Sequence, residues 1–165
     1  MATLAEAART FLAQSRIAVV GVSRQTHQPA NFNFRKLRAA GHAVFPVNPQ
    51  ADTVEGGPCY PSLAAIPGGV QAVLIFTPPA ASEGVVREAA ALGIHHVWLH
   101  RSFGGGSYSP AAERAAHELG LTLIPGGCPA MFGPPVDFGH RCLRWMLGTL
   151  CQLPTSVGAG PDAAR

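Results

Sequence analysis

The chain has 165 residues, of which 47% are apolar and 13% charged, and its formal net charge is +3. This length suits one domain with a substantial core and is short for two. The positive charges are scattered and belong almost wholly to arginines, since Lys36 is the only lysine, so there is no clustered basic stripe typical of a nucleic-acid-binding protein.

The sequence also disfavours a membrane-spanning or secreted protein and a protein held together by disulfides or zinc. No stretch reaches the roughly 18 unbroken apolar residues of a membrane span, and the first residues do not read as a secretory signal. The four cysteines, Cys59, Cys128, Cys142 and Cys151, show no C-x-x-C pair, which favours reduced thiols over a disulfide framework or a zinc site. We therefore expect a cytoplasmic protein without a bound metal.

The first elements are a helix and a buried strand. Apolar residues at helical spacing predict an amphipathic helix over Thr3–Gln14, with Thr3 and Glu6 spaced as in a capping box. The apolar run Ile17–Val20 then predicts a strand covered on both faces, as in a parallel sheet.

The rest of the chain repeats this alternation. Further strands are expected within His42–Asn48, Val70–Phe76, His96–Leu99 and Leu121–Ile124. Helices are expected from near Asn31 to Gly41, from a cap at Ser82 to Leu92, and from a cap at Ser109 to Leu119, with another possible cap at Ser62. The alternation predicts an α/β, Rossmann-like fold, a parallel five-stranded sheet with helices on both faces.

The C-terminal part is read as the end of the same domain and a tail. Residues 140–153 carry apolar residues at helical spacing and predict a further helix, which makes residues 1–153 one domain. The following residues are small and polar, so residues 154–165 are expected to form a flexible tail.

The turn after the first strand has the residues of an anion-binding site. Gly21 and Val22 allow backbone N–H groups to approach a ligand, Ser23 adds a hydroxyl, and Arg24 adds a guanidinium suited to phosphate. An ordinary loop with a surface arginine is the alternative interpretation of the same four residues.

Other turn-forming and polar residues follow the remaining strands. They are Val47, Asn48 and Pro49, then Thr77, Pro78 and Pro79, then Leu99, His100 and Arg101, and finally Gly126 to Pro129. Because the carboxyl ends of parallel strands share one edge of a sheet, we expect these loops to converge on one ligand site.

The glycine pattern disfavours two common nucleotide sites. The first strand is followed by Gly21-x-Ser23 and not by G-x-G-x-x-G, and Asn48-Pro49 stands where a dinucleotide-binding protein places an acidic residue on the ribose, so NAD is disfavoured. The chain also lacks G-x-x-x-x-G-K-[ST], which excludes a P-loop triphosphatase on pattern.

Several motifs in order resemble a known family. They are Val-Val-Gly-Val-Ser-Arg at residues 19–24, Pro-Val-Asn-Pro at 46–49, Cys-Tyr-Pro-Ser-Leu at 59–63, Thr-Pro-Pro at 77–79, and Val-Trp-Leu at 97–99. This combination resembles the CoA-binding domain family, which is similar to the nucleotide-binding domain at the amino end of the succinyl-CoA synthetase alpha chain. The likeness covers roughly Phe11 to Cys128.

The resemblance implies a Rossmann-type fold that holds CoA. It implies that the diphosphate lies near Gly21, Ser23 and Arg24, that the adenosine end lies by Val47, Asn48, Pro49 and the loop Thr77–Pro79, and that the pantetheine arm runs toward Leu99 and His100. Gln50 stands where relatives often carry a lysine, so a cationic contact there is missing or comes from Arg24 or Arg101.

Two function classes follow. The first is a module that binds CoA or an acyl-CoA without catalysis, with no nucleic-acid or membrane partner. The second is an enzyme that uses NAD(P) or a CoA thioester, with Cys128 in a glycine-rich turn as nucleophile or His100 at a strand end as base. By the resemblance, the phosphorylated histidine of the synthetase lies in a second domain with no counterpart here, which favours the binding module.

Overall fold

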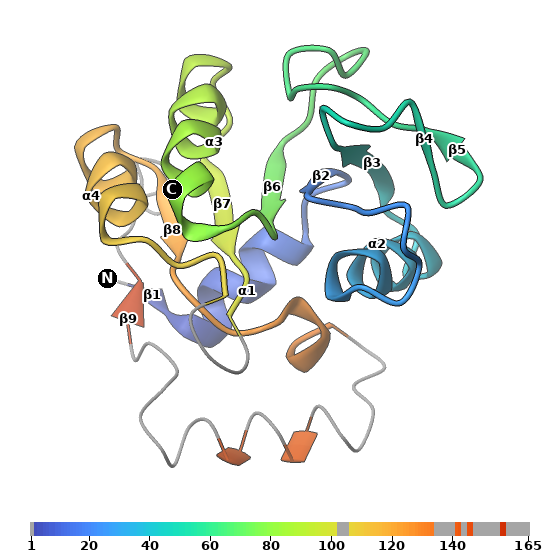
Figure 1. Cartoon of the computed structure of the whole chain (residues 1–165). Coiled ribbons are helices and arrows are strands. Elements are labelled where there is room, and N and C mark those ends of the chain that lie inside the picture. The colour runs from blue at the N-terminus through green and yellow to red at the C-terminus, as the bar shows by residue number, and fades with distance from the viewer. Residues whose placement is uncertain (1, 102–105, 134–140, 143–144, 147–155, 158–165) are drawn as a thin grey trace.

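A five-stranded parallel sheet forms the centre of the computed structural model, which describes residues 2–101, 106–133, 141–142, 145–146 and 156–157 (Figure 1). The strand order is β3-β2-β6-β7-β8, and every neighbouring pair is parallel. The strands are β2 (Arg16–Val20), β3 (Ala43–Val47), β6 (Ala72–Ile75), β7 (His96–Leu99) and β8 (Thr122–Ile124). All five lie within a residue or two of the predicted segments, so the predicted sheet is confirmed.

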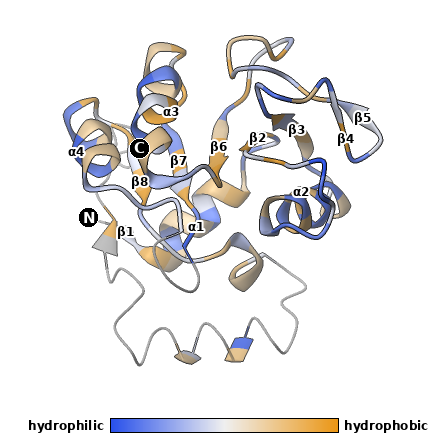
Figure 2. Cartoon of the chain, viewed as in Figure 1, coloured by the Kyte–Doolittle hydropathy of each residue, from blue (hydrophilic) through white to orange (hydrophobic). Residues whose placement is uncertain are grey.

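Helices cover both faces of this sheet, as predicted. They are α1 (Leu4–Leu12), α2 (Pro29–Ala39), α3 (Pro79–Ala91) and α4 (Pro110–Glu118), with the short 3₁₀ helix η1 (Pro129–Met131) after β8. Alternate strand residues point to opposite layers: Ile17 and Val19 pack with α1 and α2, whereas Ala18 and Val20 pack with α3 and α4. In Figure 2, β6 is hydrophobic throughout whereas α2 carries many hydrophilic residues, as a strand between two layers and an outer helix require.

Two small antiparallel pairs flank the main sheet. One is the hairpin of β4 (Thr53–Val54) and β5 (Gly57–Pro58), and the other joins β1 (Ala2–Thr3) to β9 (Ser156–Val157). The segment 154–165, expected to be a tail, thus contributes two residues to a strand, and its other residues lie outside the described ones. The expected helix at 140–153 also lies mostly outside them, with helical residues at 141–142 and 145–146.

Two helix starts agree with their predicted caps. The Thr3 hydroxyl accepts from the Glu6 N–H at 3.2 Å and the Glu6 carboxylate accepts from the Thr3 N–H at 2.7 Å, which completes the capping box. The Ser109 hydroxyl accepts from the Ala112 N–H at 3.4 Å at the start of α4. None of the described helices is long and apolar enough to cross a membrane.

Of the other two helices, only α3 starts away from its predicted position. α2 begins at Pro29, within two residues of the expected start near Asn31, whereas α3 begins at Pro79, three residues before Ser82. In both cases proline occupies the first helical turn, where its fixed φ fits and its missing N–H costs nothing. Ser62 caps no helix, because residues 61–69 form turns.

Candidate functional site

The strand order reverses between β2 and β6, because the connection from β2 leads outward to β3 and the chain then returns to β6 on the other side. In doubly wound sheets ligands bind in the crevice that such a reversal opens at the carboxyl ends of the strands. A cavity of about 540 Å³ lies there, within the range of about 300–1,000 Å³ found for small-molecule sites. We call it the strand-end cavity.

Three of the five strand ends meet in this cavity. Its lining residues are Gly21, Ser23, Gln28, Pro29, Ala30, Phe76, Thr77, Pro78, His100, Gly106 and Ser107. The loops after β2, β6 and β7 supply them together with the starts of α2 and α3. The loops after β3 and β8, which were expected to converge here too, supply no lining residue in the described part of the chain.

Gly21 sets the close approach of the ends of β2 and β6. Its φ is +98°, and its N–H donates to the carbonyl of Val47 at 2.8 Å. A Cβ at this position would lie 3.1 Å from the carbonyl carbon of Phe76. A side chain is therefore disfavoured here both by the backbone conformation and by the neighbouring strand end.

The buried side chain of Asn31 holds the loop between β2 and α2. Its Oδ1 accepts from the Ser23 N–H at 3.0 Å, and its Nδ2 donates to the Ser23 carbonyl at 2.7 Å and to the Glu55 carboxylate at 2.7 Å. The Ser23 hydroxyl accepts from the Gln25 N–H at 3.0 Å. Ser23 thus uses its backbone N–H within the protein and retains its hydroxyl proton for a ligand.

Residues at the starts of both α2 and α3 line the strand-end cavity, and neither start has a capping side chain. Gln28 and Pro78 are the N-cap residues, neither makes a side-chain cap hydrogen bond, and neither helix has an acidic residue in its first turn. By contrast, α1 and α4 carry a side-chain cap and an acidic residue, Glu6 and Glu113 respectively. The first N–H groups of a helix and its dipole favour an anion, so two uncapped starts at one cavity are suited to phosphate groups.

His100 forms an uncharged wall of this cavity. Its ring stacks on Phe76 with centroids 4.3 Å apart, and the residue is 8% exposed. Burial lowers the pKa of His100 from 6.5 to about 4, so the imidazole is uncharged near pH 7. Beside it, the buried Ser82 hydroxyl donates to the Ser107 carbonyl at 2.7 Å and ties α3 to the loop after β7.

The remaining residues expected at the site do not line the cavity. Val22 and Leu99 are fully buried in the core, Val47 is 3% exposed, Arg24 and Pro49 are exposed, and Pro79 is the first residue of α3. The Asn48 side chain donates to the Val22 carbonyl at 3.0 Å and accepts from the Gln50 N–H at 2.8 Å. Its amide therefore braces two loops.

Cys128 lies outside the strand-end cavity. The residue is 4% exposed, and its Sγ donates to Asn33 Oδ1 at 3.4 Å. Cys59 is also a buried free thiol. Among the described residues no group of three or more histidine, cysteine, aspartate or glutamate side chains is placed to hold a metal ion.

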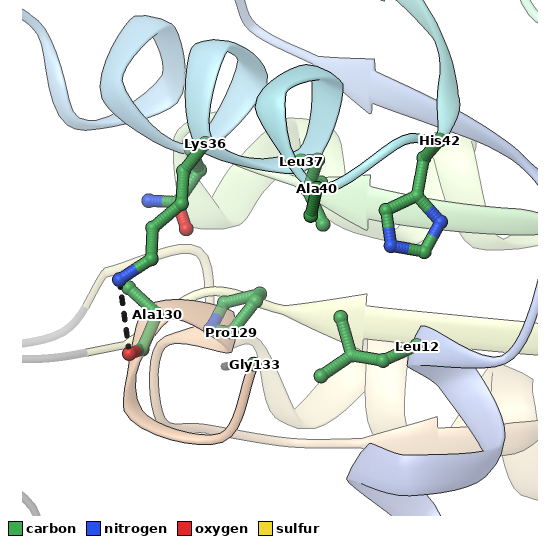
Figure 3. Close-up of a pocket in the computed structure, with 9 residues that line it drawn as sticks. Leu12, Lys36, Leu37, Ala40, His42, Pro129, Ala130 and Gly133 are labelled. Atoms are coloured by element: carbon green, nitrogen blue, oxygen red, sulfur yellow. Dashed lines mark hydrogen bonds between the residues drawn. The ribbon is translucent and has the colours of Figure 1, made fainter. Parts of the chain in front are cut away.

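A second cavity of about 290 Å³ lies between α1, α2 and η1 (Figure 3). Its lining residues are Leu12, Asn33, Lys36, Leu37, Ala40, His42, Pro129, Ala130 and Gly133. Lys36 Nζ donates to the Ala130 carbonyl at 3.4 Å, and His42 Nδ1 lies 2.9 Å from the Gln14 carbonyl oxygen. We call it the helix-side cavity, since it lies along the middle and end of α2, away from the start of that helix.

Residues 15–134 match the family described as CoA binding domain. The chain belongs to this family. Among solved structures it is similar to a hypothetical protein of Pyrococcus horikoshii OT3, with 32% identity, a TM-score of 0.70, and coverage of 76% of this chain and 86% of the other.

Two curated relatives show that segments similar to this chain occur both in small proteins and as part of much larger ones. The uncharacterized protein YneT of Bacillus subtilis is 28% identical over 113 residues, which are 68% of this chain and 81% of the relative. Acetate–CoA ligase [ADP-forming] I of Archaeoglobus fulgidus is 26% identical over 126 residues, which are 73% of this chain but 18% of the ligase. The chain therefore spans about a fifth of the ligase, as a CoA-binding domain related to one region of a larger protein.

Sequence reasoning missed several residues that build the site. Gln28, Phe76 and Ser107 line the cavity, while Asn31 and Glu55 hold its first loop. The available signal was Asn31 itself, which lies three residues before Phe34 on the inward face of α2. A polar residue on an apolar helix face has to be hydrogen-bonded, and this indicates a partner elsewhere in the chain.

Proposed function

We propose that this protein binds CoA or an acyl-CoA in the strand-end cavity and does not itself turn it over. The observation that carries the proposal is the pair of uncapped helix starts, α2 and α3, directed into one cavity at the reversal of the sheet. The family and the relation to a CoA ligase region support the choice of CoA among phosphate-bearing ligands.

The residues present fit the phosphates of such a ligand. No carboxylate is among the described residues that line the cavity. The nearby Glu55 is neutralised by Arg35, whose NH1 lies 2.6 Å from its carboxylate oxygen. In this proposal the diphosphate binds to the helix starts, the Ser23 hydroxyl and the exposed Arg24 beside it.

The rest of the ligand is assigned by the family resemblance. The adenosine end would lie toward Val47, Asn48 and Pro49 and the loop Thr77–Pro79, and the pantetheine arm would lie toward Leu99 and His100. In that arrangement the stacked Phe76 and His100 rings would form an uncharged wall beside the arm.

The surroundings of the two candidate catalytic residues, His100 and Cys128, support the proposed absence of turnover. Burial lowers the pKa of His100 to about 4, which makes it a weak base near pH 7, and no described carboxylate hydrogen-bonds to its ring to orient it. Cys128 is buried against Asn33 and does not line the cavity. In the described part of the chain, His100 therefore has no carboxylate to orient it, and Cys128 does not reach the strand-end cavity.

A ligand panel tests the proposal directly. At a hundredfold excess over Kd, CoA should stabilise the protein by about 2.7 kcal/mol. For a chain of this size this corresponds to a rise in Tm of about 5–10 °C. NAD and NADP at the same concentration should shift Tm less. A larger shift with NAD(P), or hydrolysis of acetyl-CoA that disappears in Cys128→Ser or His100→Phe, would instead establish the enzyme alternative.

One substitution separates phosphate binding from folding. Gln28→Asp places a good N-cap and a negative charge at the start of α2, so the helix should be stabilised by about 0.3–1 kcal/mol. The same charge should weaken CoA binding about tenfold or more by repelling phosphate. Ala39→Asp adds the same charge at the exposed far end of α2, which does not line the cavity, and should weaken binding less. Equal affinities of Gln28→Asp and the parent in calorimetric titration would refute the placement of the phosphates.

A further inference from the structure

The turn of the β4–β5 hairpin contains a strained residue that is not glycine. Glu55 has φ +50° and is followed by Gly56 at φ +74°, between Thr53–Val54 and Gly57–Pro58. This is the two-residue hairpin turn in which asparagine, aspartate or glycine is favoured at the first position. Among the described residues Glu55 is the only non-glycine residue with positive φ. Backbone strain of this kind persists where the side chain has a task in the surrounding structure.

The Glu55 side chain joins the hairpin to the loop of the strand-end cavity. Its Oε1 accepts from Asn31 Nδ2 at 2.7 Å and from Arg35 NH1 at 2.6 Å, and the side chain is 10% exposed. Asn31 in turn holds both backbone groups of Ser23, and Arg35 NH1 donates to the Thr26 carbonyl at 2.9 Å. One carboxylate thus connects, through two side chains, to two points of the loop that enters the cavity.

The hairpin lies on the same side of the molecule as α2 (Figure 1). It follows the first loop by more than twenty residues, so local backbone structure does not impose these contacts. Since Asn31 is fully buried, its amide needs partners on both its oxygen and its nitrogen. Glu55 supplies one of them, and the charge on that carboxylate is balanced by Arg35.

We propose that Glu55 is a positioning residue, which acts through Asn31 and Arg35 to hold the loop from Val22 to Gln28 in the conformation that binds the phosphates. The expected effect of Glu55 on CoA affinity rests on the proposed function. The strained backbone of Glu55 is retained because its carboxylate orders the binding loop. A residue needed only for the hairpin would be served better by glycine.

Glu55→Gly separates these two roles. Glycine relieves the positive φ, which offsets part of the stability lost when Asn31 and Arg35 lose their acceptor, so the Tm of the ligand-free protein should change by only a few degrees. Loss of the carboxylate should weaken CoA binding at least fivefold. It should also speed amide hydrogen exchange over residues 22–28 of the ligand-free protein, where the Ser23 N–H is held by Asn31. Glu55→Gln keeps an accepting oxygen and should restore most of the affinity and the protection.

A matched control lies in the same hairpin segment. Asp52 is exposed, and its carboxylate makes no hydrogen bond to the described residues of the binding loop, so Asp52→Ala removes the same charge without touching the Asn31 connection. Its affinity for CoA should stay within twofold of the parent, and exchange over residues 22–28 should be unchanged.

The outcomes are distinguishable from a failure of the proposed function. If the parent does not bind CoA, the proposed function is wrong, and hydrogen exchange of the ligand-free variants alone decides the role of Glu55. If the parent binds CoA and Glu55→Gly binds it equally with unchanged exchange, the positioning role is refuted. A fall of Tm and affinity together in both Glu55→Gly and Glu55→Gln would show a folding role only and also overturn the proposal.

Discussion

The two cavities lie along the same helix and differ in which part of it they use. The strand-end cavity is lined by the start of α2, whose first N–H groups have no capping side chain. The glycine turn after β2 and the start of α3 also line it. The helix-side cavity lies along the middle and end of α2 and is lined mainly by aliphatic side chains such as Leu12 and Leu37. Since an anion is favoured at a helix start and disfavoured at a helix end, position on one helix decides which cavity suits a phosphate.

The largest expected effect is a difference between two glycines, Gly21 directly after β2 and Gly41 after the end of α2. Gly21 and Gly41 have nearly the same φ, +98° and +97°, but a Cβ at Gly21 meets the Phe76 backbone at 3.1 Å whereas a Cβ at Gly41 meets nothing within 4 Å. Gly41→Ala should lower the free energy of unfolding by about 1–2 kcal/mol and Gly21→Ala by about 2–4 kcal/mol, as measured by urea denaturation. Equal losses would show that the contact with β6 is unimportant.

The second effect tests the uncharged wall of the strand-end cavity. Because the pKa of His100 is lowered to about 4 in the folded protein, the unfolded chain binds the proton first as pH falls below about 6.5. Stability from this residue is complete above pH 6.5 and should fall by about 2–3 kcal/mol between pH 7 and pH 4.5. His100→Phe keeps a ring to stack on Phe76 and should lack this part of the pH dependence. Identical pH profiles of the two proteins would contradict the neutral buried state.

The third effect concerns the arginine beside the cavity. Arg24→Ala removes a charge-assisted contact worth about 1.5–3 kcal/mol, so CoA affinity should fall about ten- to hundredfold. Arg38→Ala is the matched control on α2, where the guanidinium lies over the Phe34 ring at 5.6 Å. It should leave the affinity unchanged at moderate salt. Binding by Arg24→Ala as tight as the parent's would remove Arg24 from the site.

The smallest effect is expected in the helix-side cavity. Leu12→Ala shortens a half-buried side chain at the end of α1 and should cost about 1 kcal/mol of stability, less than the 2–5 kcal/mol of a fully buried leucine. CoA affinity should not change. A loss of affinity larger than the loss of stability would show that the two cavities communicate through α2.

The sheet and most of its helices could be predicted because their signals are local. The runs Ile17–Val20 and Ala72–Ile75 are apolar on both faces, and Ser109-Pro110 is a helix start in itself. The start of α3 was misplaced by three residues because Ser82 was preferred as the cap over the preceding prolines. The error concerns a turn that lines the cavity.

The position of the strand-end cavity could be predicted in part, and the hydrogen bonds that hold its first loop could not. Gly21, Ser23, Thr77, Pro78 and His100 were expected at the strand ends and do line one cavity. The bonds that hold the binding loop join residues far apart in sequence, as the contact of Asn31 with Glu55 does across 24 positions. Periodicity and turn patterns report on neighbours in sequence. They therefore cannot show which buried amide donates a hydrogen bond to which carboxylate.

The pairing of β1 with β9 bears on where a folding unit ends. The family match covers residues 15–134, yet Val157 is 1% exposed and packs in the same cluster as Leu4 and Phe11, whose ring meets Trp98 edge-on at 5.2 Å. A protein cut to the matched segment would lose this covering layer and leave the Trp98 side of the sheet open to water. It should self-associate through that apolar face, so homology alone would set the wrong boundaries for excising this domain.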